Sequence, residues 1–117
     1  MSKAKAKGTA AESALVAYLR GQGFPYAERR ALSGAVDLGD LTGTPCLAWE
    51  VKSHKTYQFP AWLKETAIEK DNAGADFGIL VAKPNGVGLN SVGQWFAVMS
   101  VYDMVDLLRT AGFGDPL

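Results

Sequence analysis

The chain has 117 residues, of which 48% are hydrophobic and 21% are charged, and its formal net charge is zero. These values fit one globular domain with a single core. There is no long apolar run to predict a transmembrane helix, and the N-terminal MSKAKAKG lacks the apolar centre of a secretory signal. The single cysteine, Cys46, excludes an internal disulfide and fits a reducing cytoplasm, and with only one histidine it argues against a zinc site.

The charge is unevenly distributed along the chain. Residues 1–30 contain six basic and two acidic residues, a net charge of +4, whereas residues 66–117 contain three basic and six acidic residues, a net charge of −3. A basic N-terminal part suggests one face suited to phosphates. The alternative is that residues 1–8 are only a solubilising, flexible basic tail, and we place the start of the folded domain at residue 9.

The first predicted element is a helix over residues 9–22. Thr9 and Glu12 have the spacing of a capping box, and apolar residues at helical spacing follow them until glycines end the helix. A short strand is predicted over residues 24–30. The next two strands, 34–41 and 45–52, are predicted to pair as a hairpin through a tight turn at Gly43 and Thr44.

The second half of the chain alternates helices and strands. A helix is predicted over residues 60–73, ended by Gly74. The continuous apolar run 77–82 indicates a buried strand, and the preceding helix makes it parallel to a hairpin strand. Beyond a glycine-rich loop, residues 95–99 form the last predicted strand, and residues 100–110 form a helix capped by its first residue.

The element order is therefore αβββαββα. It predicts an α/β fold with one central mixed β-sheet flanked by helices, in a single domain over residues 9–117. The hairpin is expected at the centre of this sheet.

The hairpin gathers chemically useful side chains. Its predicted register places Asp37 opposite Glu50, with Cβ atoms roughly 5 Å apart. Lys52 shares the face of Glu50 because strand side chains alternate with period two, while Trp49 and Val51 point into the core.

Two carboxylates this close can hold a divalent cation. Magnesium uses one or two carboxylates, retains several waters and accepts phosphate oxygens for its remaining positions. An ammonium beside the ion, here Lys52, can orient a water nucleophile or stabilise developing charge. The pattern predicts a site for phosphodiester hydrolysis. The competing interpretation is an exposed hairpin on which Glu50 and Lys52 are only an ordinary surface Glu–Lys pair.

Glu12 has two interpretations that the residues alone leave open. As the third residue of a capping box it would bind a backbone amide in the first helical turn. It also lies at the end of the helix's apolar stripe, from where its carboxylate could project toward the sheet and join the metal site.

Other charged residues receive weaker expectations. Glu65 and Glu69, four residues apart, look like a solvated helix face, and Asp40 is offset by one from the active face of the hairpin, so none of these three is expected to be a ligand. Lys55 and His54 follow Lys52 in a loop, where a basic pair could hold phosphate or simply be solvated.

Several short motifs recur in a fixed order along the chain. In sequence they are Lys7-Gly8, Glu12, Gly23-Phe24, Arg30, Ser33-Gly34, Asp37 and Glu50-Val51-Lys52. This order resembles the PD-(D/E)xK nuclease superfamily and, within it, the small Holliday-junction resolvases of the archaeal type. The resemblance covers about residues 7–83. It departs from the family at Val36, where a proline often precedes the motif aspartate.

The resemblance implies a restriction-endonuclease-like core and specific catalytic roles. Asp37, Glu50 and Glu12 would bind Mg²⁺, for which Mn²⁺ should substitute. Lys52 would position the attacking water or stabilise the transition state, and Ser33 would lie near the scissile phosphate.

The resemblance also implies partners. Lys7, Arg29 and Arg30 would contact DNA backbone phosphates, with Lys55 as a further candidate from its loop position. Such resolvases are homodimers that present two sites to a four-way junction, in the cytoplasm of a bacterial, archaeal or phage-infected cell.

The expected function is therefore a magnesium-dependent DNA endonuclease acting on Holliday junctions. One alternative is a nuclease of the same superfamily that cuts duplexes, flaps or single strands. Another is a catalytically inactive nucleic-acid-binding module with the same fold. The fold hosts many substrates, so the choice of a junction is analogy.

Overall fold

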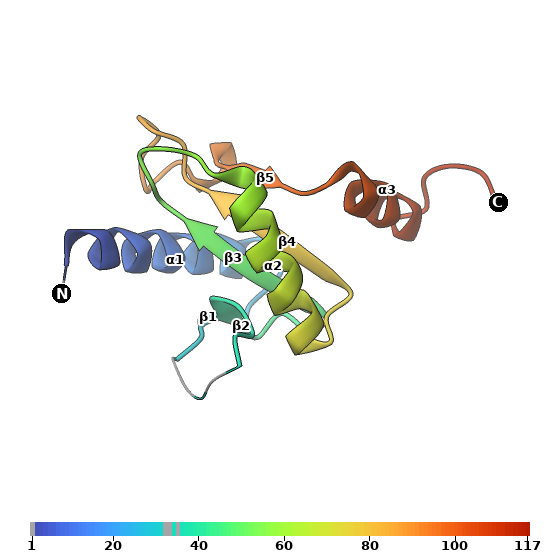
Figure 1. The fold of residues 1–117 in the computed structure, drawn as a ribbon, viewed down its shortest axis with the longest axis horizontal. Coiled ribbons are helices and arrows are strands. Elements are labelled where there is room, and N and C mark those ends of the chain that lie inside the picture. Colours follow the sequence, from blue (N-terminus) through green and yellow to red (C-terminus); the bar gives the residue numbers. More distant parts are fainter. Residues whose placement is uncertain (1, 32–33, 35) are drawn as a thin grey trace.

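The computed structural model describes residues 2–31, 34 and 36–117 (Figure 1). The elements follow the predicted order αβββαββα, with a short 3-10 helix, η1, before the last strand. They are α1 (Lys3–Gly21), β1 (Glu28–Arg29), β2 (Leu41–Thr42), β3 (Leu47–Lys52), α2 (Phe59–Ala73), β4 (Phe77–Ala82), η1 (Val92–Gln94), β5 (Phe96–Val98) and α3 (Val101–Thr110).

Helix α1 begins six residues earlier than predicted. The Ser2 hydroxyl caps it by accepting a hydrogen bond from the backbone N–H of Lys5 at 3.1 Å. The predicted capping box at Thr9 and Glu12 is therefore wrong, because both residues lie well inside the helix. Residues 3–8, expected in a basic tail, form its first turns.

The strands form two sheets, not one. β1 and β2 make a small antiparallel pair, while β3, β4 and β5 make a separate mixed sheet in that order. β3 and β4 are parallel, as the intervening helix predicted, and β5 is antiparallel to β4. The predicted central hairpin between residues 34–41 and 45–52 is wrong, since β3 pairs with β4 and β2 pairs with β1.

The turn before β3 explains this error. The N–H of Leu47 bonds to the carbonyl of Thr44 at 3.2 Å, with Pro45 and Cys46 between them. Cys46 adopts a positive φ of 70°, as the third residue of such a turn can require. The turn thus lies two residues beyond the predicted one. Gly43 instead packs against the residues just before β1, where a Cβ would meet the Tyr26 carbonyl oxygen at 1.8 Å.

The three-stranded sheet lies between two helices (Figure 1). On one face, Trp49 and Val51 of β3 pack with Leu15 and Val16 of α1 in the main core, as predicted. On the other face, Trp62 of α2 packs with residues of β4. Glu50 and Lys52 alternate with Trp49 and Val51, so they face α2.

Helix α3 stands apart from this body in Figure 1. Ser100 caps it through the N–H of Asp103, as predicted, and no residue along its length is buried. None of the helices among the described residues combines the length and the apolarity needed to cross a membrane.

Candidate metal centre

Asp37 is positioned by a local turn at the edge of β3. Its Oδ1 accepts the N–H of Gly39 at 3.0 Å, and its carbonyl accepts the side-chain amide of Asn72 on α2 at 2.9 Å. Gly39 has a φ of 100°, and a Cβ there would lie 2.8 Å from the carbonyl oxygen of Trp49. Only glycine fits this combination of conformation and close approach.

Asp40, rather than Asp37, lies directly beside β3. Its N–H donates to the carbonyl of Trp49 at 2.7 Å, and its Oδ2 accepts the N–H of Val51 at 2.7 Å. The predicted register that paired Asp37 with Glu50 is therefore wrong. The offset of Asp40 from the active face was expected from the same register; its carboxylate instead lies close enough to Glu50 to raise the pKa of that residue, while the expectation that Asp40 is not a ligand stays a prediction.

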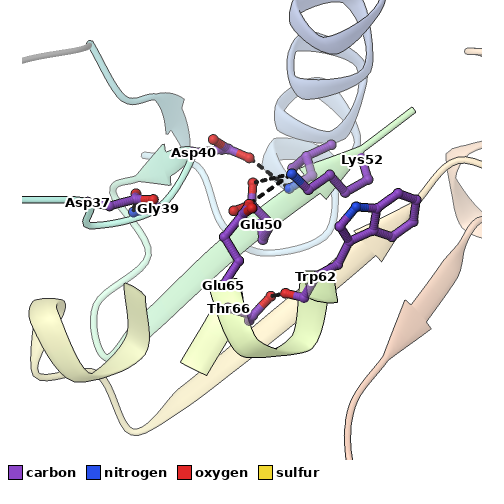
Figure 2. Close-up of polar contacts among 9 residues, drawn as sticks. Asp37, Gly39, Asp40, Glu50, Lys52, Trp62, Glu65 and Thr66 are labelled. Carbon is purple, nitrogen blue, oxygen red and sulfur yellow. Dashed lines mark hydrogen bonds and ion pairs between the residues drawn. The ribbon is translucent and has the colours of Figure 1, made fainter. Parts of the chain in front are cut away.

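Lys52 extends along the α2 face of the sheet (Figure 2). Its Nζ lies 2.8 Å from Glu65 and 4.0 Å from Glu50, and 5.9 Å from the ring centre of Trp62. Burial disfavours its charged form, but the hydrogen bond to Glu65 and the charges of Glu50 and Asp40 outweigh burial and raise its pKa. Lys52 is therefore a cation at neutral pH.

Glu69 overturns the prediction of a solvated helix face. The buried residues of α2 are Trp62, Thr66 and Glu69, one stripe at helical spacing, so the helix turns Glu69 toward the sheet. Only 1% of Glu69 is exposed. Its neighbour Glu65 is partly exposed at the rim, where it pairs with Lys52.

Three carboxylates meet between these elements. Asp37, Glu50 and Glu69 each place one carboxylate oxygen within 4.8 Å of the other two. They come from a turn, a strand and a helix, and Glu50 and Glu69 are buried. Oxygen ligands so grouped could hold a divalent cation such as Mg²⁺ or Mn²⁺.

The crowding of these acids perturbs their protonation. Burial raises the pKa of Glu50 well above its usual range, and the neighbouring carboxylates of Glu69, Asp40 and Glu65 add to this effect. Burial likewise raises the pKa of Glu69 to about 8. A hydrogen bond with Glu50 lowers the pKa of Glu65, and Lys52 contributes in the same direction. Without a cation the centre therefore holds protons at neutral pH.

Glu12 lies on the wall of the same cleft but outside this group of three. It accepts the Nε–H of Arg29 at 3.0 Å. Burial raises the pKa of Glu12, and the hydrogen bond with Arg29 opposes this effect. The charge of Asp40 raises the pKa further. The structure thus brings Glu12 to the site's edge, while its role as a metal ligand stays a prediction.

An open cleft of about 620 Å³ gives access to the centre. Its acidic lining comprises Glu12, Asp37, Asp40, Glu50 and Glu65, and its basic lining comprises Lys5, Arg29 and Arg30. Acidic and basic side chains in one cleft suit a ligand that combines a metal ion with phosphate groups.

The remaining predicted residues lie elsewhere. Lys7 is exposed on α1 and Lys55 is exposed in the loop after β3, and neither lines the cleft. Ser33 lies outside the described residues. Lys5, which the sequence reasoning did not single out, lines the cleft where Lys7 was expected to act.

A signal for Glu69 was present in the sequence. Trp62, Thr66 and Glu69 stand at positions i, i+4 and i+7, which define one helix face. Because Trp62 is the largest apolar residue of α2, its face was the strongest candidate for burial, and a carboxylate on a buried face is unusual enough to indicate a site.

Comparison with known proteins identifies no relative: no protein-family model, no curated protein and no solved structure matches this chain.

Proposed function

We propose that this protein is a metal-dependent endonuclease that hydrolyses DNA phosphodiester bonds, with the four-way junction as its preferred substrate. The observation that carries the proposal is the meeting of Asp37 and Glu50 beside Lys52 in a cleft with basic walls. The αβββαββα order and the family resemblance of the motifs support a restriction-endonuclease-like fold.

The donor set fits a hard divalent cation. Asp37 and Glu50 offer carboxylate oxygens, which Mg²⁺ and Mn²⁺ prefer, and Asp37 is exposed so that water and phosphate can complete the coordination. When bound, such a cation would supply charge neutralisation and activation of a water molecule. The family resemblance would add Glu12 as a third ligand, but the carboxylate of Glu12 is paired with Arg29 and lies outside the group of three.

Lys52 serves as a cationic donor rather than a proton acceptor. The raised pKa of Lys52 keeps its ammonium charged in the ion-free centre, which favours a role as a cationic donor over that of a general base. Its pairing with Glu65 at 2.8 Å holds the side chain over the centre (Figure 2). From there it can orient the attacking water or stabilise charge that develops on the phosphate.

The hydrolytic step needs no covalent enzyme intermediate. The oxygen of one water forms a new bond to phosphorus and that water gives up a proton; one ester P–O bond breaks, and the leaving alkoxide takes up a proton, so no proton is gained or lost overall. Arg29 and Arg30, on the cleft wall, are suited to hold phosphate oxygens of the DNA backbone.

The assignment of the centre is tested by removing its charges. Asp37→Asn and Glu50→Gln should each lower Mg²⁺-dependent cleavage of a labelled four-way junction by at least about a hundredfold, while junction binding persists. Lys52→Ala should also be severely impaired. The matched control is Asp71→Asn, which removes an exposed carboxylate of α2 that does not line the cleft, and it should cut at the wild-type rate. Normal cutting by Asp37→Asn or Glu50→Gln would disprove the site.

A panel of labelled DNA structures tests the substrate. Symmetric nicks in the four-way junction, with linear duplex, flap and single strand spared, support junction resolution. Preferential cutting of another structure would keep the nuclease chemistry and reject the junction. A complete lack of metal-dependent cutting would favour an inactive binding module.

A further inference from the structure

Glu69 is a buried carboxylate on a helix face that otherwise packs against the sheet. It shares this face with Trp62 and Thr66 and is only 1% exposed. Among the described residues, neither of its oxygens meets a hydrogen-bond donor from a cationic, amide or hydroxyl group. A carboxylate buried without a positive partner or donor costs several kcal/mol, and proteins keep such groups where an ion or a function compensates.

The groups beside Glu69 do not supply that compensation. Its polar neighbours are all acids: Asp37 and Asp40 raise its pKa, and the hydrogen bond with Glu50 that opposes them brings no positive charge. Gly39 lies over it, since a Cβ on Gly39 would come within 3.6 Å of its Oε2. The nearby cation Lys52 is paired with Glu65 instead. A positive charge is missing at this point.

The geometry matches that of an ion's ligands. In an octahedral shell with bonds of about 2.1 Å, ligand oxygens are separated by roughly 3 to 4 Å. The oxygens of Asp37, Glu50 and Glu69 lie within 4.8 Å of one another, so a small inward movement brings them to a common ion. Three chain segments would then be joined at that ion.

We propose that Glu69 is a direct ligand of the divalent cation, which is held by Asp37, Glu50 and Glu69, and that Glu12 is not a ligand. The inference deepens the proposed function, on which its catalytic meaning rests, but it concerns ion binding that needs no DNA. The ion is a hard cation of the Mg²⁺ and Mn²⁺ class, because all three ligands are carboxylates.

The position of Glu12 supports its exclusion. It projects from α1, which packs on the Trp49 and Val51 face of β3, whereas Glu50 and Glu69 lie on the α2 face. Its carboxylate is already paired with Arg29 at 3.0 Å. Asp40 lies between the two groups as the acid that influences both Glu12 and Glu50.

The test measures Mn²⁺ binding to the intact DNA-free chain by electron paramagnetic resonance, and magnesium competition for the same site. Wild-type protein should bind one Mn²⁺ saturably. Glu69→Gln should weaken binding roughly tenfold or more, because a directly bound charge is lost. Glu69→Asp, which keeps the charge but withdraws the carboxylate by one methylene, should also weaken it. Asp71→Asn, the matched control on α2, and Glu12→Gln should bind Mn²⁺ as the wild type does.

Circular dichroism and thermal unfolding of each variant show that its fold is intact. Should Glu69→Gln fail to fold, Glu69→Asp decides the outcome. Wild-type affinity in the Glu69 variants, a loss in Glu12→Gln as large as that in Glu69→Gln, or no saturable Mn²⁺ binding by the wild type would overturn the inference. Mn²⁺ binding that depends on Glu69 without any DNA cleavage would reject the proposed function and leave the ion site standing. DNA cleavage together with Mn²⁺ binding that does not depend on Glu69 would keep the proposed function and reject Glu69 as a ligand.

Discussion

At the scale of single residues, the carboxyl of Glu69 links the stability of the ion-free protein to pH. Burial raises its pKa from 4.5 to about 8. An acid whose pKa is higher in the folded than in the unfolded chain binds its proton more tightly when folded. Its contribution to stability is therefore complete below about pH 4.5 and is lost as the pH rises through about 8. Glu50, whose pKa is also raised, acts in the same direction.

We expect the ion-free wild type to be less stable at pH 8 than at pH 6, with Glu69 responsible for about 2 kcal/mol of the difference. Urea denaturation of wild type and Glu69→Gln at both pH values, with chelator present, measures this term. The loss between pH 6 and pH 8 should be about 2 kcal/mol smaller in the variant. Equal losses in the two proteins would show that Glu69 does not titrate in this range.

Gly39 is the second residue on which the centre depends. Its φ of 100° and the 2.8 Å approach to the Trp49 carbonyl leave no space for a Cβ. Gly39→Ala should destabilise the protein by about 1–3 kcal/mol and weaken Mn²⁺ binding, because the N–H of Gly39 holds Asp37.

Gly86→Ala is the matched control for this substitution. Gly86 also has a positive φ, of 80°, but nothing lies within 4 Å of its Cβ position. Gly86→Ala should lower the stability only by the cost of its positive φ, which is less than the cost in Gly39→Ala, and it should bind Mn²⁺ with wild-type affinity. Thermal unfolding and Mn²⁺ titration of both variants measure the two effects, and an unchanged Mn²⁺ affinity in Gly39→Ala would mean that the turn does not position Asp37.

At the scale of elements, the sequence predicted the helix ends and strands that depend on nearby residues. The end of α2 at Gly74, the cap of α3 at Ser100 and the parallel strand 77–82 all agree with the sequence analysis. α1 starts before the predicted helix, because a lysine-rich terminus, although typical of a flexible tail, forms its first turns. Alternating alanine and lysine are strong helix formers, and Ser2 supplies the cap.

Tertiary contacts decided the elements that the sequence analysis misplaced. The turn at Pro45 and Cys46 lies two residues beyond the predicted turn, and β2 pairs with β1. Hydropathy patterns do not reveal such a change of strand pairing. Asp37 and Glu50 nevertheless meet, because the turn at Gly39 brings Asp37 back to the edge of β3. Glu69 is buried because α2 turns the face of Trp62 toward the sheet. The apolar residues Leu63 and Ile68 lie on other faces of α2, so hydropathy alone did not show which face is buried.

At the scale of the whole molecule, α3 is an amphipathic helix whose apolar face has no buried residue. Val101, Met104, Val105 and Leu108 form one stripe, and they are between 40% and 73% exposed. An exposed apolar stripe of this kind marks an interaction surface. A junction resolvase must cut two strands, so a second copy of the chain is the partner that the proposed function requires, and a twofold contact through α3 would present two centres.

We therefore expect the wild type to form a homodimer that Val105→Glu disrupts, because a buried carboxylate without a partner costs several kcal/mol. Thr110→Glu is the matched control, since it adds the same charge on the opposite side of the same helix. Sedimentation equilibrium should give a dimer for the wild type and Thr110→Glu, and a monomer for Val105→Glu, with little change in thermal stability because no residue of α3 is buried. Junction cleavage should then change from paired nicks to single, unlinked nicks in Val105→Glu. A wild type that stays monomeric at all concentrations, or a Val105→Glu dimer as tight as that of the wild type, would exclude α3 as the contact.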